Sequence, residues 1–181
     1  MPPSFKLSDF DFDLPEELIA QKPVKLRDQS RLMILDRKSG TIDHAVFSDL
    51  PHRLPTPSLI VFNDTKVIPA KLQGYLVNSG RGIEILLLRE NDGGHWEALI
   101  KGLSKLKEGT EIGFGGELLK ATLTARQNDR AILKLTGPGD LRQTLNRVAT
   151  TPLPPYIHRD AATEENLTEL DRKRYQTVFA K

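Results

Sequence analysis

GIEILLLRENDGGHWEALI, residues 82–100, contains two apolar runs separated by an Asn-Asp-Gly-Gly turn sequence. Apolar runs on both sides of such a turn are typical of a β-hairpin. Similar runs recur about every 10 residues between Lys66 and Thr136, a spacing typical of all-β folds. The candidate strands lie in VIPAKLQGYLV, GIEILLLRE, HWEALI, GTEIGF, ELLKATLTA and RAILKLT. These six runs are enough to close a small antiparallel β-barrel.

The sequence on either side of this region is mixed. RLMILD (31–36) and TIDHAVF (41–47) predict a hairpin, and LIVF (59–62) predicts a short buried strand. Residues 140–148 predict a helix that begins at Asp140, and a charged helix is expected over 163–174. We therefore predict an α/β (α+β) domain into which a small antiparallel β-barrel domain is inserted.

The predicted domains follow these changes in pattern. Residues 1–66 are the first part of the α/β domain, 67–150 are the barrel with a terminal helix, and 151–181 return to the α/β domain. TPLPPYI (151–157) predicts a rigid, extended connector because its prolines lack amide donors. The chain stops at RYQTVFAK, within an apolar–polar pattern, so we expect the α/β domain to be incomplete in this fragment.

Composition excludes several classes of site. The 181 residues include no cysteine, which excludes disulfides, Cys-ligated zinc and iron–sulfur clusters and suits a reducing cytoplasm. The 26 basic and 24 acidic residues leave a net charge of +2, which does not argue for nucleic-acid binding by itself. The four histidines show no metal-ligand spacing, and we expect no metal site and no membrane span.

The first candidate site lies in IVFNDTKVIPAKL, residues 60–72, where polar residues follow an apolar run. Ligands of open α/β sheets gather just past the carboxyl ends of strands. Asn63, Asp64 and Lys66 offer hydrogen bonds and a cation for a carboxylate or phosphate. The alternative is an Asx-turn with a solvated lysine.

The second candidate site follows the proline-rich connector. Tyr156, His158 and Arg159 are suited to stacking on a base and meeting a phosphate. An equally open alternative to RNA binding is that Tyr156 and Ile157 pack the two domains together. GFGG (113–116) lacks the strand–helix setting of a dinucleotide-binding loop, so we interpret it as a hairpin turn.

Several stretches together resemble one family. They are KLSDFDFDLPEELIAQKP, SRLMILDR, FSDLP, LIVFNDTKVIPAKL, GIEILLLRE, and PLPPYIHR followed by RYQTVFA. In this order they resemble the N-terminal half of the S-adenosylmethionine:tRNA ribosyltransferase-isomerases of queuosine biosynthesis. The resemblance implies an α/β domain interrupted by a small barrel. It also implies transfer and isomerisation of the ribosyl moiety of S-adenosylmethionine onto 7-aminomethyl-7-deazaguanine in tRNA, giving epoxyqueuosine.

The resemblance also implies partners and site residues. We expect a cytoplasmic enzyme, monomeric when full-length, that acts on tRNA with a GUN anticodon and uses S-adenosylmethionine as co-substrate, with no cofactor. The expected substrate-binding residues are Asn63, Asp64, Thr65, Lys66, Lys71, Arg174 and Tyr175. Lys71 stands where the family commonly has arginine, so a bidentate clamping role for it is less secure. The expected tRNA-binding residues are Tyr156, His158 and Arg159.

The catalytic residues remain unassigned. The resemblance places most of the catalytic machinery in the missing C-terminal half, so we expect this fragment to be inactive alone. One alternative is a non-enzymatic RNA-binding β-barrel protein, in which Arg89, Lys101, Lys105, Lys107 and Arg126 form a basic face. Another is a purely structural pair of domains that binds neither S-adenosylmethionine nor RNA.

Overall fold

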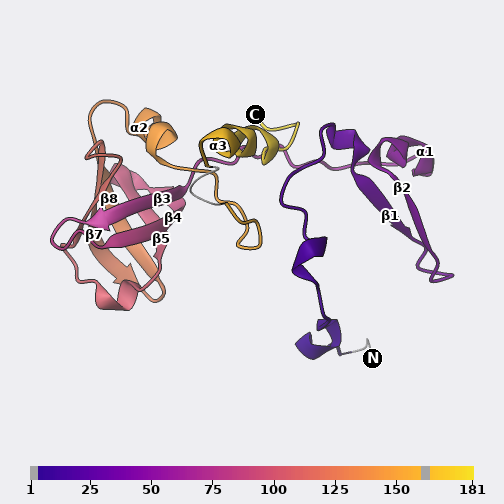
Figure 1. Ribbon diagram of the computed structural model, residues 1–181, viewed down its shortest axis with the longest axis horizontal. Coiled ribbons are helices and arrows are strands. Elements are labelled where there is room, and N and C mark those ends of the chain that lie inside the picture. Colours follow the sequence, from indigo (N-terminus) through magenta and orange to yellow (C-terminus); the bar gives the residue numbers. More distant parts are fainter. Residues whose placement is uncertain (1–3, 160–163) are drawn as a thin grey trace. The chain divides into compact units, whose positions relative to one another are not determined.

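The computed structural model describes residues 4–159 and 164–181. Within it, the chain divides into two compact units, each formed by two segments (Figure 1). The first unit consists of Met1–Val61 and Pro154–Arg159, and the second of Phe62–Leu153 and Asp160–Lys181. The domain boundaries expected from the sequence, after residues 66 and 150, stay predictions.

The second unit contains a closed antiparallel barrel (Figure 1). Its strands are β3 (Lys71–Leu76), β4 (Gly82–Asn91), β5 (His95–Ile100), β6 (Glu111–Phe114), β7 (Leu119–Gln127) and β8 (Arg130–Thr136). Their order around the barrel is β3-β4-β5-β8-β7-β6, and pairing of β3 with β6 closes it. The predicted α+β class with a small antiparallel barrel is confirmed.

The barrel core follows from the alternation of side chains along each strand. Inward-facing residues such as Leu72, Ile85 and Leu133 are fully buried. Gly74 has no side chain, which leaves space for the ring of Phe114 to lie against its backbone inside the barrel. Because each strand has a neighbour on both sides, the barrel has no unpaired edge among its strands.

A helix packs against this core. Helix α2 (Leu141–Val148) buries Leu145 in the hydrophobic cluster of the barrel. The helix was predicted to begin at Asp140, which is its N-cap, and the Asp140 carboxylate accepts a hydrogen bond of 2.8 Å from the backbone N–H of Arg142. The side-chain cap satisfies a donor that the first turn of the helix leaves without an internal partner.

The glycine-rich stretch at residues 113–116 ends strand β6 and begins the turn of residues 115–118 that leads to β7. Gly115 and Gly116 have φ angles of +57° and +63°, a region that favours glycine. The predicted hairpin turn is confirmed. Short 3₁₀-helices, η5 (Asp92–Gly94) and η6 (Leu103–Lys105), lie in two other connections of the barrel.

The first unit is built around one hairpin. Strands β1 (Arg31–Leu35) and β2 (Ile42–Val46) pair antiparallel, as predicted. The short helices around them are η1 (Leu7–Phe10), η2 (Glu16–Leu18), η3 (Arg27–Gln29), η4 (Phe47–Asp49) and α1 (Leu50–Arg53). None of the described residues of this unit is buried.

The buried strand predicted at residues 59–62 is wrong. Leu59 and Val61 are 92% and 87% exposed, and the segment belongs to no strand. No described strand pairs with this segment, so its side chains are not enclosed in a sheet core. An apolar run therefore indicates a tendency to be buried, which only a neighbouring element can fulfil.

Helix α3 (Glu164–Arg174) follows the proline-rich connector. Its predicted first residue, Thr163, lies outside the described residues. The Arg172 guanidinium donates a hydrogen bond of 2.8 Å to the carbonyl of Ala149, just after α2. Residues 151–154 form neither helix nor strand, in agreement with the predicted connector. The extended conformation predicted as far as residue 157 is wrong at residues 155–157, where the chain forms a turn closed by the hydrogen bond from the Ile157 N–H to the Pro154 carbonyl.

No helix in the described part of the chain is long and apolar enough to cross a membrane. Within residues 4–159 and 164–181, no three His, Asp or Glu side chains gather in a group that could hold a metal ion.

Candidate functional site

Two segments that are far apart in the sequence meet at Val67. The Gln176 side chain donates from Nε2 to the carbonyl oxygen of Val67 (2.6 Å), and its Oε1 accepts from the Val67 N–H (2.8 Å). One amide side chain thus satisfies both main-chain polar groups of a residue 109 positions away. This contact holds RYQTVFAK beside the end of FNDTKV, the two segments expected to bind substrate.

Further contacts join the same two segments. The rings of Phe62 and Phe179 have centroids 4.4 Å apart. The Lys181 N–H donates to the carbonyl of Asp64 (3.1 Å), and its Nζ lies 3.5 Å from the Asp64 carboxylate. Asp64 remains 61% exposed at its side chain, so this surface ion pair contributes little stability.

The polar residues between Phe62 and Val67 lie at the surface. Asn63 Oδ1 accepts a hydrogen bond of 2.9 Å from the Thr65 N–H, which is the geometry of the Asx-turn weighed as the alternative. Lys66 is exposed and has no ion-pair partner in the part of the chain that the structure describes. The turn does not exclude a binding role, because it leaves Lys66 and the Thr65 hydroxyl accessible.

The other expected substrate-binding residues lie in two places. Arg174 is half-buried at the end of α3, and Tyr175, 40% exposed, follows it directly. Lys71 lies on β3, where its Nζ is 2.9 Å from a carboxylate oxygen of Glu84 on β4. A role for Lys71 in clamping a substrate stays a prediction, and it would require this ion pair to open.

The expected tRNA-binding residues lie in the first unit. Tyr156 is 53% exposed and His158 is also exposed. Arg159 Nη1 donates to the carbonyls of Gln21 (3.1 Å) and His158 (2.8 Å). The structure therefore brings Tyr156 and His158 together on one turn, with Gln21 of the N-terminal segment against it.

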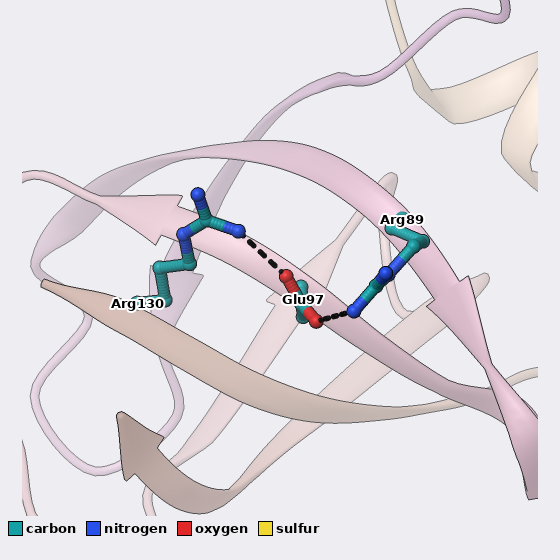
Figure 2. Close-up of polar contacts among 3 residues, drawn as sticks. All are labelled: Arg89, Glu97 and Arg130. Atoms are coloured by element: carbon teal, nitrogen blue, oxygen red, sulfur yellow. Dashed lines mark hydrogen bonds and ion pairs between the residues drawn. The ribbon is translucent and has the colours of Figure 1, made fainter. Parts of the chain in front are cut away.

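A third polar arrangement lies on the outer face of the barrel (Figure 2). The Glu97 carboxylate on β5 accepts hydrogen bonds from Arg89 on β4 and from Arg130 on β8, the latter at 2.8 Å. Only 9% of the Glu97 side chain is exposed. The hydrogen bond from Arg89, followed by that from Arg130, lowers the pKa of Glu97, and burial opposes this shift.

These charges lie beside an open hollow of about 630 Å³. Its lining residues are Leu88, Arg89, Glu97, Gln127, Asn128, Asp129 and Arg130. The two arginines are matched by two carboxylates, Glu97 and Asp129, so the formal charge of the lining is zero. The arrangement joins three neighbouring strands and has no excess positive charge to attract an anion.

Reasoning from the sequence missed three residues that organise these sites. Gln21 and Gln176 each lie within a stretch that carries the family resemblance, ELIAQKP and RYQTVFA, which was the available signal. Their roles depend on main-chain partners more than 100 positions away. Glu97 alternates with Trp96 and Ala98 along a strand, so only its outward direction was predictable.

The fold and these sites define an α+β protein with a closed barrel and two polar surface segments. Residues 7–181 match the family described as Queuosine biosynthesis protein, and the chain belongs to this family. It is 37% identical to the solved S-adenosylmethionine tRNA ribosyltransferase from Thermotoga maritima. The match covers 89% of this chain and 54% of that one, with a TM-score of 0.38. The chain thus spans about half the length of this relative.

Proposed function

We propose that the whole protein is an S-adenosylmethionine:tRNA ribosyltransferase-isomerase. It transfers and isomerises the ribosyl moiety of S-adenosylmethionine onto 7-aminomethyl-7-deazaguanine in tRNA with a GUN anticodon, giving epoxyqueuosine. S-adenosylmethionine is a co-substrate, and the proposal includes no cofactor. The observation that carries it is family membership over residues 7–181, together with 37% identity to a tRNA ribosyltransferase.

The surface around Asn63–Lys66 is the proposed substrate-binding region of this chain. Its support is the meeting of FNDTKV with RYQTVFAK through Val67 and Gln176. The exposed Lys66 ammonium is suited to the methionyl carboxylate of S-adenosylmethionine or to a phosphate. Tyr175 directly precedes Gln176 and Arg174 precedes Tyr175, so the same segment brings both near this region. The sulfonium acidifies the neighbouring carbon-bound proton, so the reaction also requires a general base.

Tyr156, His158 and Arg159 are the proposed tRNA contacts. RNA recognition commonly uses unstacked bases that pack on aromatic side chains, and Tyr156 and His158 are exposed rings suited to this. Arg159 Nη1 donates to two main-chain carbonyls, which holds the guanidinium beside the Tyr156–His158 turn. Stacking of a base on these rings does not depend on a high net positive charge, so it is compatible with the net charge of +2.

The test uses the full-length gene product. It is incubated with S-adenosylmethionine and tRNA carrying 7-aminomethyl-7-deazaguanine, and released adenine and methionine are measured. We expect release with the modified tRNA and none with tRNA that carries guanine at the same position. Residues 1–181 alone are expected to give no turnover.

Matched lysine variants locate the site within this chain. Lys66→Ala should lower kcat/KM by about tenfold or more, as expected for loss of a charge-assisted hydrogen bond. Lys38→Ala, in the exposed turn of the β1–β2 hairpin, should leave it unchanged. Full-length protein that binds tRNA without binding S-adenosylmethionine would contradict the proposal and favour an RNA-binding barrel protein.

A further inference from the structure

The Gln21 side chain uses all of its hydrogen-bonding capacity toward main-chain groups except one acceptor position. Nε2 donates to the carbonyls of Ile19 (3.2 Å) and Tyr156 (3.0 Å). Oε1 accepts from the N–H of His158 (2.8 Å). Two of these three contacts reach residues more than 130 positions away. Gln21 therefore binds the backbone on both sides of Ile157.

This pattern imitates a neighbouring β-strand. A residue in a parallel ladder donates to one residue of its neighbour and accepts from the residue two positions further on, as Gln21 does with Tyr156 and His158. The segment cannot make a regular ladder, because Pro152, Pro154 and Pro155 have no N–H group. After these prolines, the Gln21 side chain takes the place of a neighbouring strand, because it bonds the Tyr156 carbonyl and the His158 N–H.

Two further contacts restrict the same turn. The Ile157 N–H donates to the carbonyl of Pro154 (3.0 Å), which closes the turn. Arg159 Nη1 donates to the carbonyl of Gln21 (3.1 Å), so the main chain at residue 21 is bonded as well as its side chain. The backbone that presents Tyr156 and His158 is thus held on both sides of Ile157.

We propose that Gln21 is a positioning residue that holds the Tyr156–His158 turn ready to receive an unstacked RNA base. This inference rests on the proposed function, in which these two rings contact tRNA. A turn that is already ordered loses less conformational entropy when it binds, which raises affinity without adding a contact. Gln21 therefore affects affinity for tRNA and leaves affinity for S-adenosylmethionine unchanged.

The experiment compares Gln21→Ala and Gln21→Glu with Gln29→Ala in the full-length protein. Gln29 is an exposed glutamine of the same unit, placed in η3. Gln21→Glu keeps the side-chain shape and the acceptor for the His158 N–H, and it loses the donor to the Tyr156 carbonyl. It also serves if Gln21→Ala fails to fold.

Amide hydrogen exchange at His158 reports on the contact without tRNA. We expect exchange to become about tenfold faster in Gln21→Ala, as expected when a hydrogen bond is lost. Gln21→Glu should retain part of the protection, and Gln29→Ala should retain all of it. Unchanged exchange in both Gln21 variants would overturn the inference at its structural step.

Equilibrium binding supplies the functional readout. Gln21→Ala should raise the Kd for tRNA by about tenfold, the effect of one or two lost hydrogen bonds, with the Kd for S-adenosylmethionine unchanged. If Tyr156→Ala and His158→Ala weaken tRNA binding and Gln21→Ala does not, the positioning role is wrong and the proposed tRNA contact stands. If all three variants bind tRNA normally, the proposed contact is wrong and the inference falls with it.

Discussion

The barrel of β3–β8 and the β1–β2 hairpin are both antiparallel, yet only the barrel has a buried core. Leu72, Ile85 and Leu133 are fully buried in the barrel, whereas Met33 and Leu35 of the hairpin are 65% and 57% exposed. The strands differ in the number of their neighbours. Each barrel strand has two partners, and each hairpin strand has one. Burial therefore depends on the closure of the sheet more than on the hydrophobicity of a strand.

This difference predicts unequal local stability within one chain. Apolar side chains contribute to stability only when folding removes them from water, by about 25 cal/mol per Å². The barrel meets this condition, and the first unit has no fully buried residue among those described and leaves many large apolar side chains exposed. Exposed apolar surface of this kind is typical of a surface that contacts another part of a protein or a partner protein. Substitutions in the two regions should therefore have very different effects.

The largest expected difference separates two leucine substitutions. Leu133→Ala removes a fully buried side chain from the barrel and should lower the free energy of unfolding by about 2–5 kcal/mol. Leu35→Ala, in the hairpin, should change it by less than about 0.5 kcal/mol. Trp96 is the single tryptophan of the chain and is buried in the barrel, so its fluorescence during urea unfolding measures the effect of Leu133→Ala. Amide hydrogen exchange in the β1–β2 hairpin measures the effect of Leu35→Ala. Equal losses in the two variants would break the comparison.

A smaller effect is expected from adding a methyl group to the barrel interior. The Cβ of Gly74→Ala would overlap the ring of Phe114 and the carbonyl of Gly113. We expect a loss of about 1–3 kcal/mol in the free energy of unfolding, as for other overpacked cores. Gly82→Ala is the matched control because nothing lies within 4 Å of its added Cβ. A stable Gly74→Ala variant would mean that the barrel interior is not closely packed at β3 and β6.

The smallest effect is electrostatic and depends on pH. Because Arg89 and Arg130 lower the pKa of Glu97 in the folded barrel, ionised Glu97 stabilises the fold at neutral pH. This contribution is complete above the ordinary Glu pKa of 4.5 and disappears as the pH falls through the lower, folded value. Glu97→Gln should therefore reduce the loss of stability on acidification below pH 4.5.

Urea unfolding at a series of pH values measures this difference. Glu108→Gln is the control, since Glu108 is exposed in the loop before β6. If Glu97→Gln has the same pH profile as the unmodified chain, the two arginines do not stabilise the carboxylate in solution. A measured difference for Glu97→Gln would show that the barrel, unlike the hairpin, gains stability from ion pairs on its outer face as well as from its buried core.

Local patterns were sufficient to predict the elements of the barrel. Alternation of apolar and polar residues located six strands, and turn residues such as Gly115 and Gly116 separated them. The start of a helix at Asp140 was predicted in the same way. These features depend on interactions between neighbours in the sequence, which explains why the sequence alone could predict them. The buried strand at residues 59–62 failed because it required a partner strand.

The candidate sites were predictable only in part. The Asx-turn at Asn63 was one of the two alternatives that its residue types offered. Tyr156 and His158 are exposed, as a role in stacking on a base requires. The bonds from Gln176 to Val67 and from Gln21 to Tyr156 and His158 had no local signal, because any exposed glutamine has the same chemical groups. Their distance in sequence, beyond 100 residues, places them outside any periodic pattern.

The sequence by itself determined the strands of the barrel and of the β1–β2 hairpin, the turns between them, the class of fold and the family resemblance. The tertiary structure alone decided which apolar residues are buried, because burial requires a neighbour on each side of a strand. It also decided which glutamines hold distant backbone segments, and that Glu97 binds Arg89 and Arg130 from the two neighbouring strands. Hydrogen bonds and ion pairs of this kind form only after folding has brought their partners within about 3 Å.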